Sequence, residues 1–427
     1  MSRRAEQNGP VAQDCAASGG APAARRAARG LALASADRKN AALERLAAAL
    51  RDSGDALLAA NRLDLENARA AGISGAMLDR LTLNADRIGA IARGVGEIAA
   101  LPDPVGETMA AWRRPNGLEI RQVRVPLGVI AIIYEARPNV TVDAGALGFK
   151  AGNAVVLRGG REALATNREL GRLMAAAIEA EGFDPACLAM VRNPDREAIQ
   201  ILKRHPELID LIIPRGGKSL KEALAGSAVP ILPHFDGICH TYVDRAADLA
   251  MAEEICFNAK CSRPSVCNAM ETMIVHAAVA ARFLPRIAAR MRAAGVELRG
   301  DDRARALIPD CAAATAADWD TEYLDLILAV KIVDSLDEAI EFIGRHGSGL
   351  ADAIVTADPE AAARFEREVD SATVYVNAST RFTDGFEFGF GAETGISTNR
   401  LHARGPMGLR ELTIYKYVIH GEGQVRR

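Results

Sequence analysis

Cys267 stands in the segment of the sequence where the residue types point most clearly to chemistry. The segment runs Asn258-Ala-Lys-Cys-Ser-Arg-Pro-Ser-Val-Cys-Asn268 and ends just before a predicted strand, Ala269–Val275. A rigid Arg-Pro-Ser turn followed by a strand can hold a thiol still, and a thiolate is a strong nucleophile near neutral pH. We therefore expect Cys267 to attack an activated acyl carbon. The alternative is that Cys267 is a small buried hydrophobic residue, as most free cysteines are.

A polar segment after an apolar strand is the second place where the sequence offers chemistry. The predicted strand Gly128–Ile133 runs into Tyr134-Glu135-Ala136-Arg137-Pro138-Asn139. Ligands of open α/β sheets bind beyond the carboxyl ends of the strands, so we expect this segment to face a site. The Asn139 amide can donate a hydrogen bond to an oxyanion, and Arg137 can hold an anionic group of a substrate. The alternative is a polar loop with an internal ion pair.

Two glycine-rich segments follow predicted strands and are candidate phosphate sites. They are Arg158-Gly159-Gly160-Arg161 and Pro214-Arg215-Gly216-Gly217-Lys218, after the predicted strands Asn153–Leu157 and Leu208–Ile213. Glycines let backbone amides approach an anion closely, and arginine offers a planar fork to phosphate. Neither segment has the spacing Gly-x-Gly-x-x-Gly. The alternative is two ordinary turns with exposed arginines.

The seven cysteines indicate reduced thiols rather than a disulfide framework. They occupy positions 15, 187, 239, 256, 261, 267 and 311. The odd number, and the lack of an apolar leader segment, favour a cytoplasmic protein. Cys256, Cys261 and Cys267 are spaced more loosely than the paired knuckles of structural zinc sites. We therefore predict no metal.

Composition excludes several classes of function. The 427 residues are 49% hydrophobic and 25% charged, which is typical of a globular enzyme with two or three domains. The net charge of −3 gives no bulk basic field for nucleic acid or an anionic membrane. No run of eighteen apolar residues appears, so we expect no membrane span. Residues 1–25 mix small and charged residues, and we expect a disordered tail there.

The elements that must position these residues alternate between strands and helices. Residues Ser35 to Gly72 and Asp86 to Ala100 read as helices, and alternating blocks begin near Val125 and Ala246. Continuous apolar strands separated by helices indicate parallel sheets covered on both faces. Two extended arms around Pro115-Asn116-Gly117 predict a hairpin. The late strand Leu412–Ile419 is expected to pair with this hairpin or with a neighbouring subunit.

Taken together, these segments resemble the gamma-glutamyl phosphate reductase (glutamate-5-semialdehyde dehydrogenase) family of the aldehyde dehydrogenase superfamily. The resemblance runs from about residue 30 to 421. It is carried by five segments in the family's order: Val125–Asp143, Ile213–Gly217, Pro233–Asp244, Asn258–Asn268 and Gly408–Tyr417. The resemblance implies an α/β, aldehyde dehydrogenase-like fold. Its parts would be a Rossmann-type cofactor domain, an α/β catalytic domain and a β-hairpin oligomerisation arm.

The implied domains map onto discontinuous stretches of the chain. The NADPH-binding domain would comprise residues 26–103 and 126–244, and the catalytic domain residues 245–405. The arm would comprise residues 104–125 and 409–421. It would support a homodimer or a higher homo-oligomer.

The implied activity is NADPH-dependent reduction of L-glutamyl 5-phosphate to L-glutamate 5-semialdehyde and phosphate, in proline biosynthesis. Cys267 falls on the family's nucleophile. Hydrolytic aldehyde dehydrogenases carry a water-activating glutamate about thirty residues earlier, and Ala228–Val243 contains none. Its absence favours phosphate as the exchange partner. The usual Asn-Phe-Pro oxyanion segment is replaced by Arg137-Pro138-Asn139, so Asn139 and the backbone N–H of Cys267 are the candidate oxyanion donors.

The resemblance also suggests contacts for the cofactor and the substrate. Arg158 would lie near the adenosine ribose and favour a 2′-phosphate, while Glu322 would lie near the nicotinamide ribose. Arg137 or Arg263 would bind the substrate α-carboxylate. Glu135 and Ser265 complete the expected substrate contacts. Functional coupling with glutamate 5-kinase is a further expectation.

Two other functions fit parts of the sequence. One is a hydrolytic aldehyde dehydrogenase that acts on another aldehyde, and the missing glutamate argues against it. The other is an inactive dehydrogenase-like scaffold, and the intact segment around Cys267 argues against that.

Overall fold

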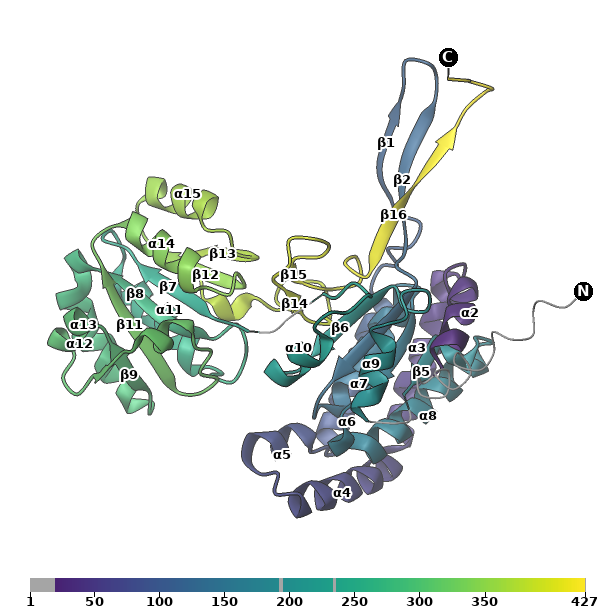
Figure 1. Ribbon diagram of the computed structural model, residues 1–427, viewed down its shortest axis with the longest axis horizontal. Helices are drawn as coiled ribbons and strands as arrows, with labels where there is room; N and C mark the ends of the chain where they lie inside the picture. The colour runs from purple at the N-terminus through teal and green to yellow at the C-terminus, as the bar shows by residue number, and fades with distance from the viewer. Residues whose placement is uncertain (1–19, 192–194, 233–235, 427) are drawn as a thin grey trace, which may run out of the picture. The chain divides into compact units, whose positions relative to one another are not determined.

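The computed structural model describes residues 20–191, 195–232 and 236–426, which divide into two compact units (Figure 1). The first unit comprises Met1–Phe235, Gly389–Gly395 and Met407–Arg427. The second comprises Asp236–Phe388 and Ile396–Pro406. The predicted domain boundary at 244/245 is therefore wrong, as is the assignment of the whole of 245–405 to one domain.

Five helices begin the described part of the first unit. They are α2 (Ala21–Leu31), α3 (Ala36–Asp52), α4 (Gly54–Ala70), α5 (Gly75–Leu81) and α6 (Ala85–Ala100). The side chains of Ser35 and Asn84 cap α3 and α6 by accepting hydrogen bonds from backbone N–H groups of the first turn. Because α2 begins at Ala21, the disordered tail predicted through residue 25 is wrong for residues 21–25. Residues 1–19 lie outside the described residues.

A four-stranded parallel sheet forms the centre of the first unit, in the order β5-β4-β3-β6. Its strands are β3 (Val129–Tyr134), β4 (Ala154–Arg158), β5 (Leu188–Met190) and β6 (Leu211–Arg215). The helices between and after them are α7 (Pro138–Lys150), α8 (Leu164–Ala180), α9 (Arg196–Leu202) and α10 (Lys218–Leu224). Alternate residues of β3 pack on α2 and α9. Ile231 forms a single parallel bridge with Ile212 of β6.

A three-stranded antiparallel sheet also belongs to the first unit. It consists of β1 (Thr108–Arg113), β2 (Glu119–Pro126) and β16 (Thr413–His420), and Figure 1 shows the three strands side by side. The turn at Gly117, with φ 90°, confirms the predicted hairpin. The late strand pairs with β2 of its own chain along its whole length.

The second unit is built on a seven-stranded parallel sheet in the order β10-β9-β11-β8-β7-β12-β13. Its strands are β7 (Cys239–Val243), β8 (Met270–His276), β9 (Glu297–Gly300), β10 (Ala312–Ala313), β11 (Ile327–Val333), β12 (Ala351–Val355) and β13 (Thr373–Val376). Because β7 pairs with β8 and β12, it lies inside this sheet and not in the first one.

Helices cover both faces of the second sheet. They are α11 (Leu249–Cys261), α12 (Ala277–Ala293), α13 (Asp302–Leu307), α14 (Leu336–His346) and α15 (Pro359–Glu368). Met273 and Val275 of β8 pack with α11 and α12, whereas Ile274 packs with α14 and α15. This alternation is the two-residue period of a strand buried on both sides. A short pair, β14 (Ile396–Ser397) and β15 (Gly405–Pro406), completes the unit. Among the described residues, no helix has the length and apolar character that a membrane span requires.

Candidate active site

Cys267 lies in the loop that joins α11 to β8, directly before the strand, as the sequence predicted. It is partly buried, and no disulfide joins the described cysteines. Since the sheet of the second unit is parallel, the amino ends of β7, β8 and β11 share one edge. Gly237, Cys267 and Glu322 each precede one of these strands, and they gather at that edge.

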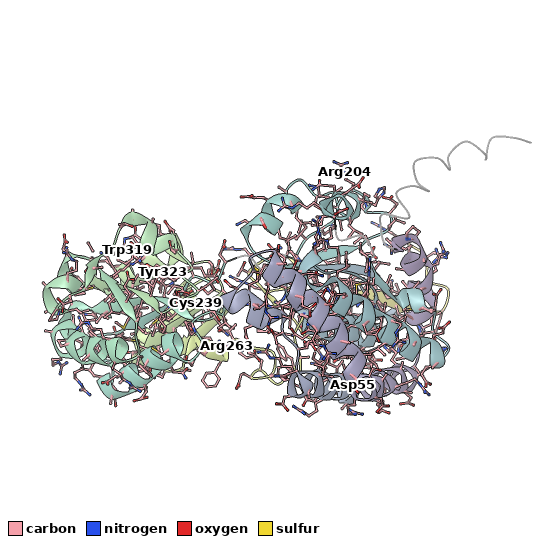
Figure 2. All side chains as sticks on the ribbon, turned by 90° about the horizontal axis from the view of Figure 1, so that it is seen from below. Asp55, Arg204, Cys239, Arg263, Trp319 and Tyr323 are labelled. Carbon is pink, nitrogen blue, oxygen red and sulfur yellow. The ribbon has the colours of Figure 1, made fainter. Side chains whose placement is uncertain are left out.

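Gly237 fixes the backbone of Cys267 by close approach. A Cβ atom at Gly237 would lie 1.9 Å from the Cys267 carbonyl oxygen and 2.5 Å from its Cα. The Sγ atom of buried Cys239 donates to the same carbonyl oxygen at 3.4 Å. Cys239 and the nearby Arg263 are labelled in Figure 2. Only glycine at 237 leaves room for this backbone contact.

Asn268 anchors the residue after the thiol. Its Nδ2 donates to the backbone oxygen of Thr383 at 2.8 Å and of Arg381 at 3.4 Å. Its backbone oxygen accepts a bond from Thr380 Oγ1 at 2.8 Å, and its Oδ1 accepts from Arg381 Nη1. The side chain and the backbone of Asn268 are thus both tied to η4 (Thr380–Phe382) and the residue after it.

A buried ion pair closes the base of the same loop. Lys260 Nζ lies 2.6 Å from Glu271 Oε2, and both side chains are 0% exposed. Burial raises the pKa of the Glu271 carboxyl to about 7, and the Lys260 charge opposes that rise. Because the pair joins the last turn of α11 to the second residue of β8, it fixes the distance that the loop must span.

Glu322, the residue expected near the nicotinamide ribose, lies beside Gly237. Burial raises the pKa of its carboxyl to about 7, and a hydrogen bond from the Gly237 backbone opposes the rise. Glu322 is therefore next to the segment that supports Cys267. Of the expected substrate residues, Arg263 is exposed and Ser265 partly buried, and both lie on the loop of Cys267.

The first unit brings its own set of expected residues together around Glu135. β3 pairs with β4 on one side and β6 on the other, so the segments after these strands are adjacent. Arg158 is 7% exposed; burial lowers its pKa, and the carboxylates of Glu162 and Glu135 oppose that. A Cβ at Gly216 would lie 2.9 Å from Glu135 Oε2. The two predicted phosphate turns therefore flank one carboxylate.

The glycines of these two turns differ in the space around them. A Cβ at Gly159 would lie 2.2 Å from Asn167 Nδ2, and one at Gly160 would lie 2.0 Å from Glu162 Oε1. Gly217 has open space around it. The first turn is thus packed against the side chains of Asn167 and Glu162, and the second has open space at Gly217.

Asn139 and Arg137 lie at the start of α7 in the same unit. Asn139 is exposed, and its Nδ2 donates to Asp143 Oδ2 at 3.0 Å. Burial raises the pKa of Asp143 to about 6, with this hydrogen bond and the Arg215 charge opposing. Asp143 orients the Asn139 amide and links it to Arg215, a link that the sequence did not suggest. Arg137 is the N-cap residue of α7.

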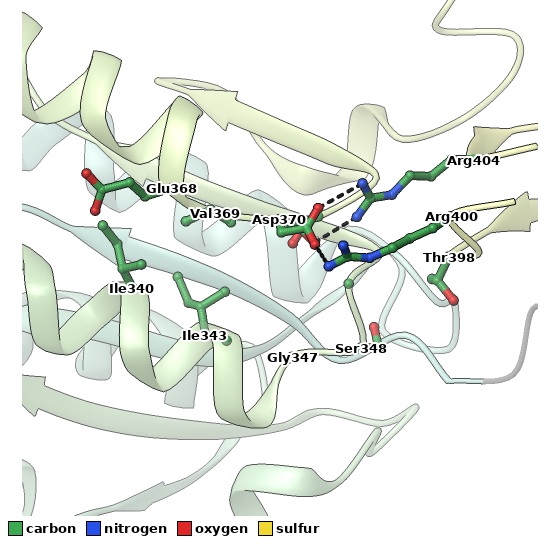
Figure 3. Close-up of a pocket in the computed structure, with 13 residues that line it drawn as sticks. Ile340, Ile343, Gly347, Ser348, Glu368, Val369, Asp370, Thr398, Arg400 and Arg404 are labelled. Atoms are coloured by element: carbon green, nitrogen blue, oxygen red, sulfur yellow. Dashed lines mark hydrogen bonds and ion pairs between the residues drawn. The ribbon is translucent and has the colours of Figure 1, made fainter.

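A separate cavity of about 420 Å³ lies within the second unit, along α14 and the segments before β12 and β13 (Figure 3). Figure 3 shows Asp370 bound to both Arg400 and Arg404 in its wall. None of the described residues that line this cavity is a cysteine, and Arg400 and Arg404 already share one carboxylate. The cavity is therefore a weaker candidate for a reaction site than the Cys267 loop. Among the described residues, no three His, Cys, Asp or Glu side chains gather as a metal site requires.

The fold agrees with comparisons against known proteins. The model of the aldehyde dehydrogenase family matches residues 11–315 and 313–418, and the chain belongs to that family. Within it, the chain is 53% identical over 404 residues to the gamma-glutamyl phosphate reductase of Syntrophomonas wolfei, covering 94% of this chain and 96% of that protein. It is 54% identical over 405 residues to the enzyme of that name from Moorella thermoacetica, covering 95% and 97%.

A solved structure supports the same relationship. The crystal structure of gamma-glutamyl phosphate reductase from Thermotoga maritima is 45% identical, with a TM-score of 0.93 over 95% of this chain and 99% of that one. The predicted family and the predicted aldehyde dehydrogenase-like fold are thus confirmed. Members of this family use NAD(P) as cofactor.

Several residues that hold the site were not anticipated from the sequence. They are Gly237, Lys260, Glu271 and Arg381. Gly237 lies inside one of the segments that carried the resemblance, so a glycine next to a buried strand was an available signal. Arg381 is 113 residues from Asn268 in the chain, and no spacing rule connects such positions.

Proposed function

We propose that the chain reduces L-glutamyl 5-phosphate to L-glutamate 5-semialdehyde and phosphate with NADPH, as a step of proline biosynthesis. The observation that carries this proposal is the match to gamma-glutamyl phosphate reductases at 53% identity across 94% of the chain. It is supported by a thiol that Gly237, Asn268 and the Lys260–Glu271 pair hold in place.

The proposed reaction proceeds through a thioester on Cys267. Its thiolate attacks the acyl carbon, a carbon–sulfur bond forms, and the carbon–oxygen bond to phosphate breaks with its electron pair leaving on phosphate. A thioester carbonyl accepts hydride far better than a carboxylate does. The cofactor, when bound, supplies that hydride. The thiohemiacetal that results collapses to the aldehyde and regenerates the thiolate.

The tetrahedral oxyanions on this path need fixed hydrogen-bond donors. We assign this role to the backbone N–H of Cys267 and the side-chain amide of Asn139. The Asn139 amide donates one hydrogen to Asp143 and carries a second for a ligand. Loss of one such donor typically costs about 3 kcal/mol, or roughly a hundredfold in rate.

The residues of the first unit fit a phosphorylated nucleotide. Gly159 and Gly160 keep the backbone free of side chains directly after the buried Arg158, and Gly217 has open space around it. We propose that Arg158 contacts the 2′-phosphate and so favours NADPH, with Arg215, Gly216 and Gly217 as further phosphate contacts. Glu322 is the proposed contact for the nicotinamide ribose.

Two arginines are the candidates for binding the substrate's α-carboxylate. Arg263 on the thiol loop or Arg137 at the start of α7 would bind the α-carboxylate, with Glu135 and Ser265 as neighbours. We also propose a homodimer or higher homo-oligomer assembled through the β1-β2-β16 sheet, a cytoplasmic location, and coupling to glutamate 5-kinase as the supplier of the acyl phosphate.

Intact-mass analysis tests the central step. Enzyme mixed with glutamyl phosphate, with cofactor withheld, should gain one glutamyl group and release one phosphate. Cys267→Ser should show neither event and should lose at least about 10⁴-fold in turnover, as loss of a nucleophile typically does. Cys261→Ser is the matched control, because that thiol contacts Met291 Sδ and not the site. An unmodified wild-type mass would refute the proposal.

Phosphate dependence separates the proposal from a hydrolytic aldehyde dehydrogenase. Oxidation of glutamate 5-semialdehyde with NADP should require phosphate, because Ala228–Val243 has no glutamate to activate water. Turnover that proceeds equally well without phosphate would favour the hydrolytic alternative. The complete absence of NADP-linked turnover in either direction would favour an inactive scaffold.

A further inference from the structure

Arg381 spans the loop that carries Cys267. It lies in η4, after β13, and is partly buried. Its Nη1 donates to Asn268 Oδ1, and its Nε donates to Ser262 Oγ at 3.1 Å. Ser262 and Asn268 stand near the two ends of the loop. The guanidinium is therefore held across the segment in which the thiol sits.

The charges around Arg381 are those of an anion site. Burial lowers the pKa of Arg381, and the neighbouring Arg263 charge lowers it further, while Cys267 and Asp384 oppose this. Two guanidinium charges that interact with each other repel each other unless an anion binds between them. Arginine pairs of this kind bind phosphate through parallel N–H donors. Arg263 on the loop and Arg381 across it thus provide two guanidinium groups near Cys267.

We propose that Arg381, together with Arg263, binds the phosphate group of the acyl phosphate and holds it as it departs. This inference rests on the proposed function and deepens it. The phosphorus of an acyl phosphate is separated by one oxygen from the carbon that Cys267 attacks, whereas three carbons separate that carbon from the α-carboxylate. A cation close enough to interact with the thiol therefore meets the phosphate first.

The step balances without another reactant. The thiolate forms a bond to the acyl carbon, the carbon–oxygen bond breaks, and the electron pair stays on the phosphate oxygen. Charge that begins on sulfur ends on phosphate, beside the Arg381 guanidinium. In the reverse direction the same guanidinium orients inorganic phosphate for attack on the thioester. Arg381 is thus a residue that distinguishes phosphate from water as the acyl acceptor.

The reverse reaction gives the sharpest test. Wild type, Arg381→Gln and Arg381→Lys are assayed for oxidation of glutamate 5-semialdehyde with NADP at varied phosphate. Arg381→Gln should raise the KM for phosphate at least about 10-fold, because a charged fork to phosphate is lost. The KM values for semialdehyde and NADP should change less than about 3-fold. Arg381→Lys keeps the charge but loses the planar fork, so its phosphate KM should lie between those of the other two enzymes, about 3-fold or more above wild type.

A control variant and a stability measurement keep the test decisive. Arg367→Gln on α15 removes an exposed guanidinium that pairs with Glu368, and it should leave every KM unchanged. If Arg381→Gln melts too low for kinetics, the phosphate KM of Arg381→Lys relative to wild type decides, with an increase of about 3-fold or more expected.

Three outcomes would overturn the inference. A raised KM for semialdehyde with an unchanged KM for phosphate would make Arg381 the reader of the α-carboxylate. A fall in kcat with all KM values unchanged in both variants would leave Arg381 only a loop-positioning role. Equal changes in all three KM values would mean a general structural defect. Wild-type turnover that does not need phosphate would instead refute the proposed function itself.

Discussion

The two units of this protein hold their candidate site residues in different ways. In the first unit the residues follow the strands β3, β4 and β6, at the carboxyl edge of the sheet, and glycine turns set their positions. In the second unit Cys267 precedes β8, at the amino edge, and side chains set its position. Backbone turns suit the binding of a phosphate by amides. Fixed side chains suit a thiol that must meet a carbon at one angle.

The comparison predicts that the second unit depends more on single buried side chains. Lys260→Met leaves the Glu271 carboxyl buried without its cation, and this should destabilise the unit by about 3–5 kcal/mol. Chemical unfolding measures the loss. Arg367→Gln, at an exposed pair, should cost at most about 1 kcal/mol. The double variant Lys260→Met/Glu271→Leu should recover much of the loss, and failure to recover would mean that packing rather than charge is responsible.

Substitution of Gly237 tests whether catalysis tolerates a displacement of the loop that carries Cys267. A Cβ there would overlap the Cys267 backbone, so Gly237→Ala must move the thiol. Misplacement of a nucleophile by about 1 Å costs roughly 10²-fold, and we expect a fall of that size in kcat. Gly344→Ala in α14 meets no atom within 4 Å and should leave kcat unchanged. At Gly159 the added Cβ meets side chains, those of Asn167 and Tyr134, and no backbone atom within that distance is among its nearest neighbours, so Gly159→Ala should lose less activity, mainly through the KM for NADP. Equal losses at 237 and 159 would remove the contrast between the units.

Arg158 tests whether the first unit reads phosphate. Arg158→Glu should raise the KM for NADPH about 10-fold more than the KM for NADH, because the carboxylate repels a 2′-phosphate. Initial rates with each cofactor give the ratio. Arg161→Gln is the control on the same turn, because Arg161 pairs with Asp195. An equal rise for both cofactors would show that Arg158 does not read the 2′-phosphate.

The smallest expected effect is a change in how the stability of the protein depends on pH, caused by substitution of Asp143. Its carboxyl has a pKa of about 6 in the folded protein, above its ordinary value of 3.8, because burial favours the neutral form. The folded state therefore binds the proton more tightly than the unfolded state, and stability falls as pH rises from about 4 to about 6. Asp143→Asn removes this dependence. Its melting temperature relative to wild type should be higher at pH 7.5 than at pH 4.5, and a constant difference would contradict the assignment.

The sequence predicted the parts of the fold that repeat a simple pattern. The run of β-branched residues before Tyr134 placed β3 to within one residue, and the helix predicted over Asp86 to Ala100 matches α6 to within one residue. Alternation of strands and helices gave the parallel sheets. The boundary between the units was wrong because nothing in the run Cys239–Val243 says which sheet it joins; pairing with β8 and β12 decides that.

The site was predictable only where one segment carries it. Cys267 could be placed before a strand because the loop and the strand are adjacent in sequence. The Lys260–Glu271 pair could not, because a lysine and a glutamate eleven positions apart form a pair only once the chain reverses between them. Arg381 reaches Asn268 from η4, far along the second unit's sequence. Such contacts come from the order of strands in the sheet, which composition and periodicity do not specify.

The chain crosses between its two units four times, at 235/236, 388/389, 395/396 and 406/407. No uninterrupted stretch of the gene therefore encodes either unit. During synthesis the ribosome must release the residues after 406 before β2 can pair with β16. The first unit, whose residues are synthesised first, is therefore the last to complete its fold. Truncation after Gly395 removes pieces of both units, residues 396–406 of the second and 407–427 of the first, and should yield aggregate rather than a separable folded half.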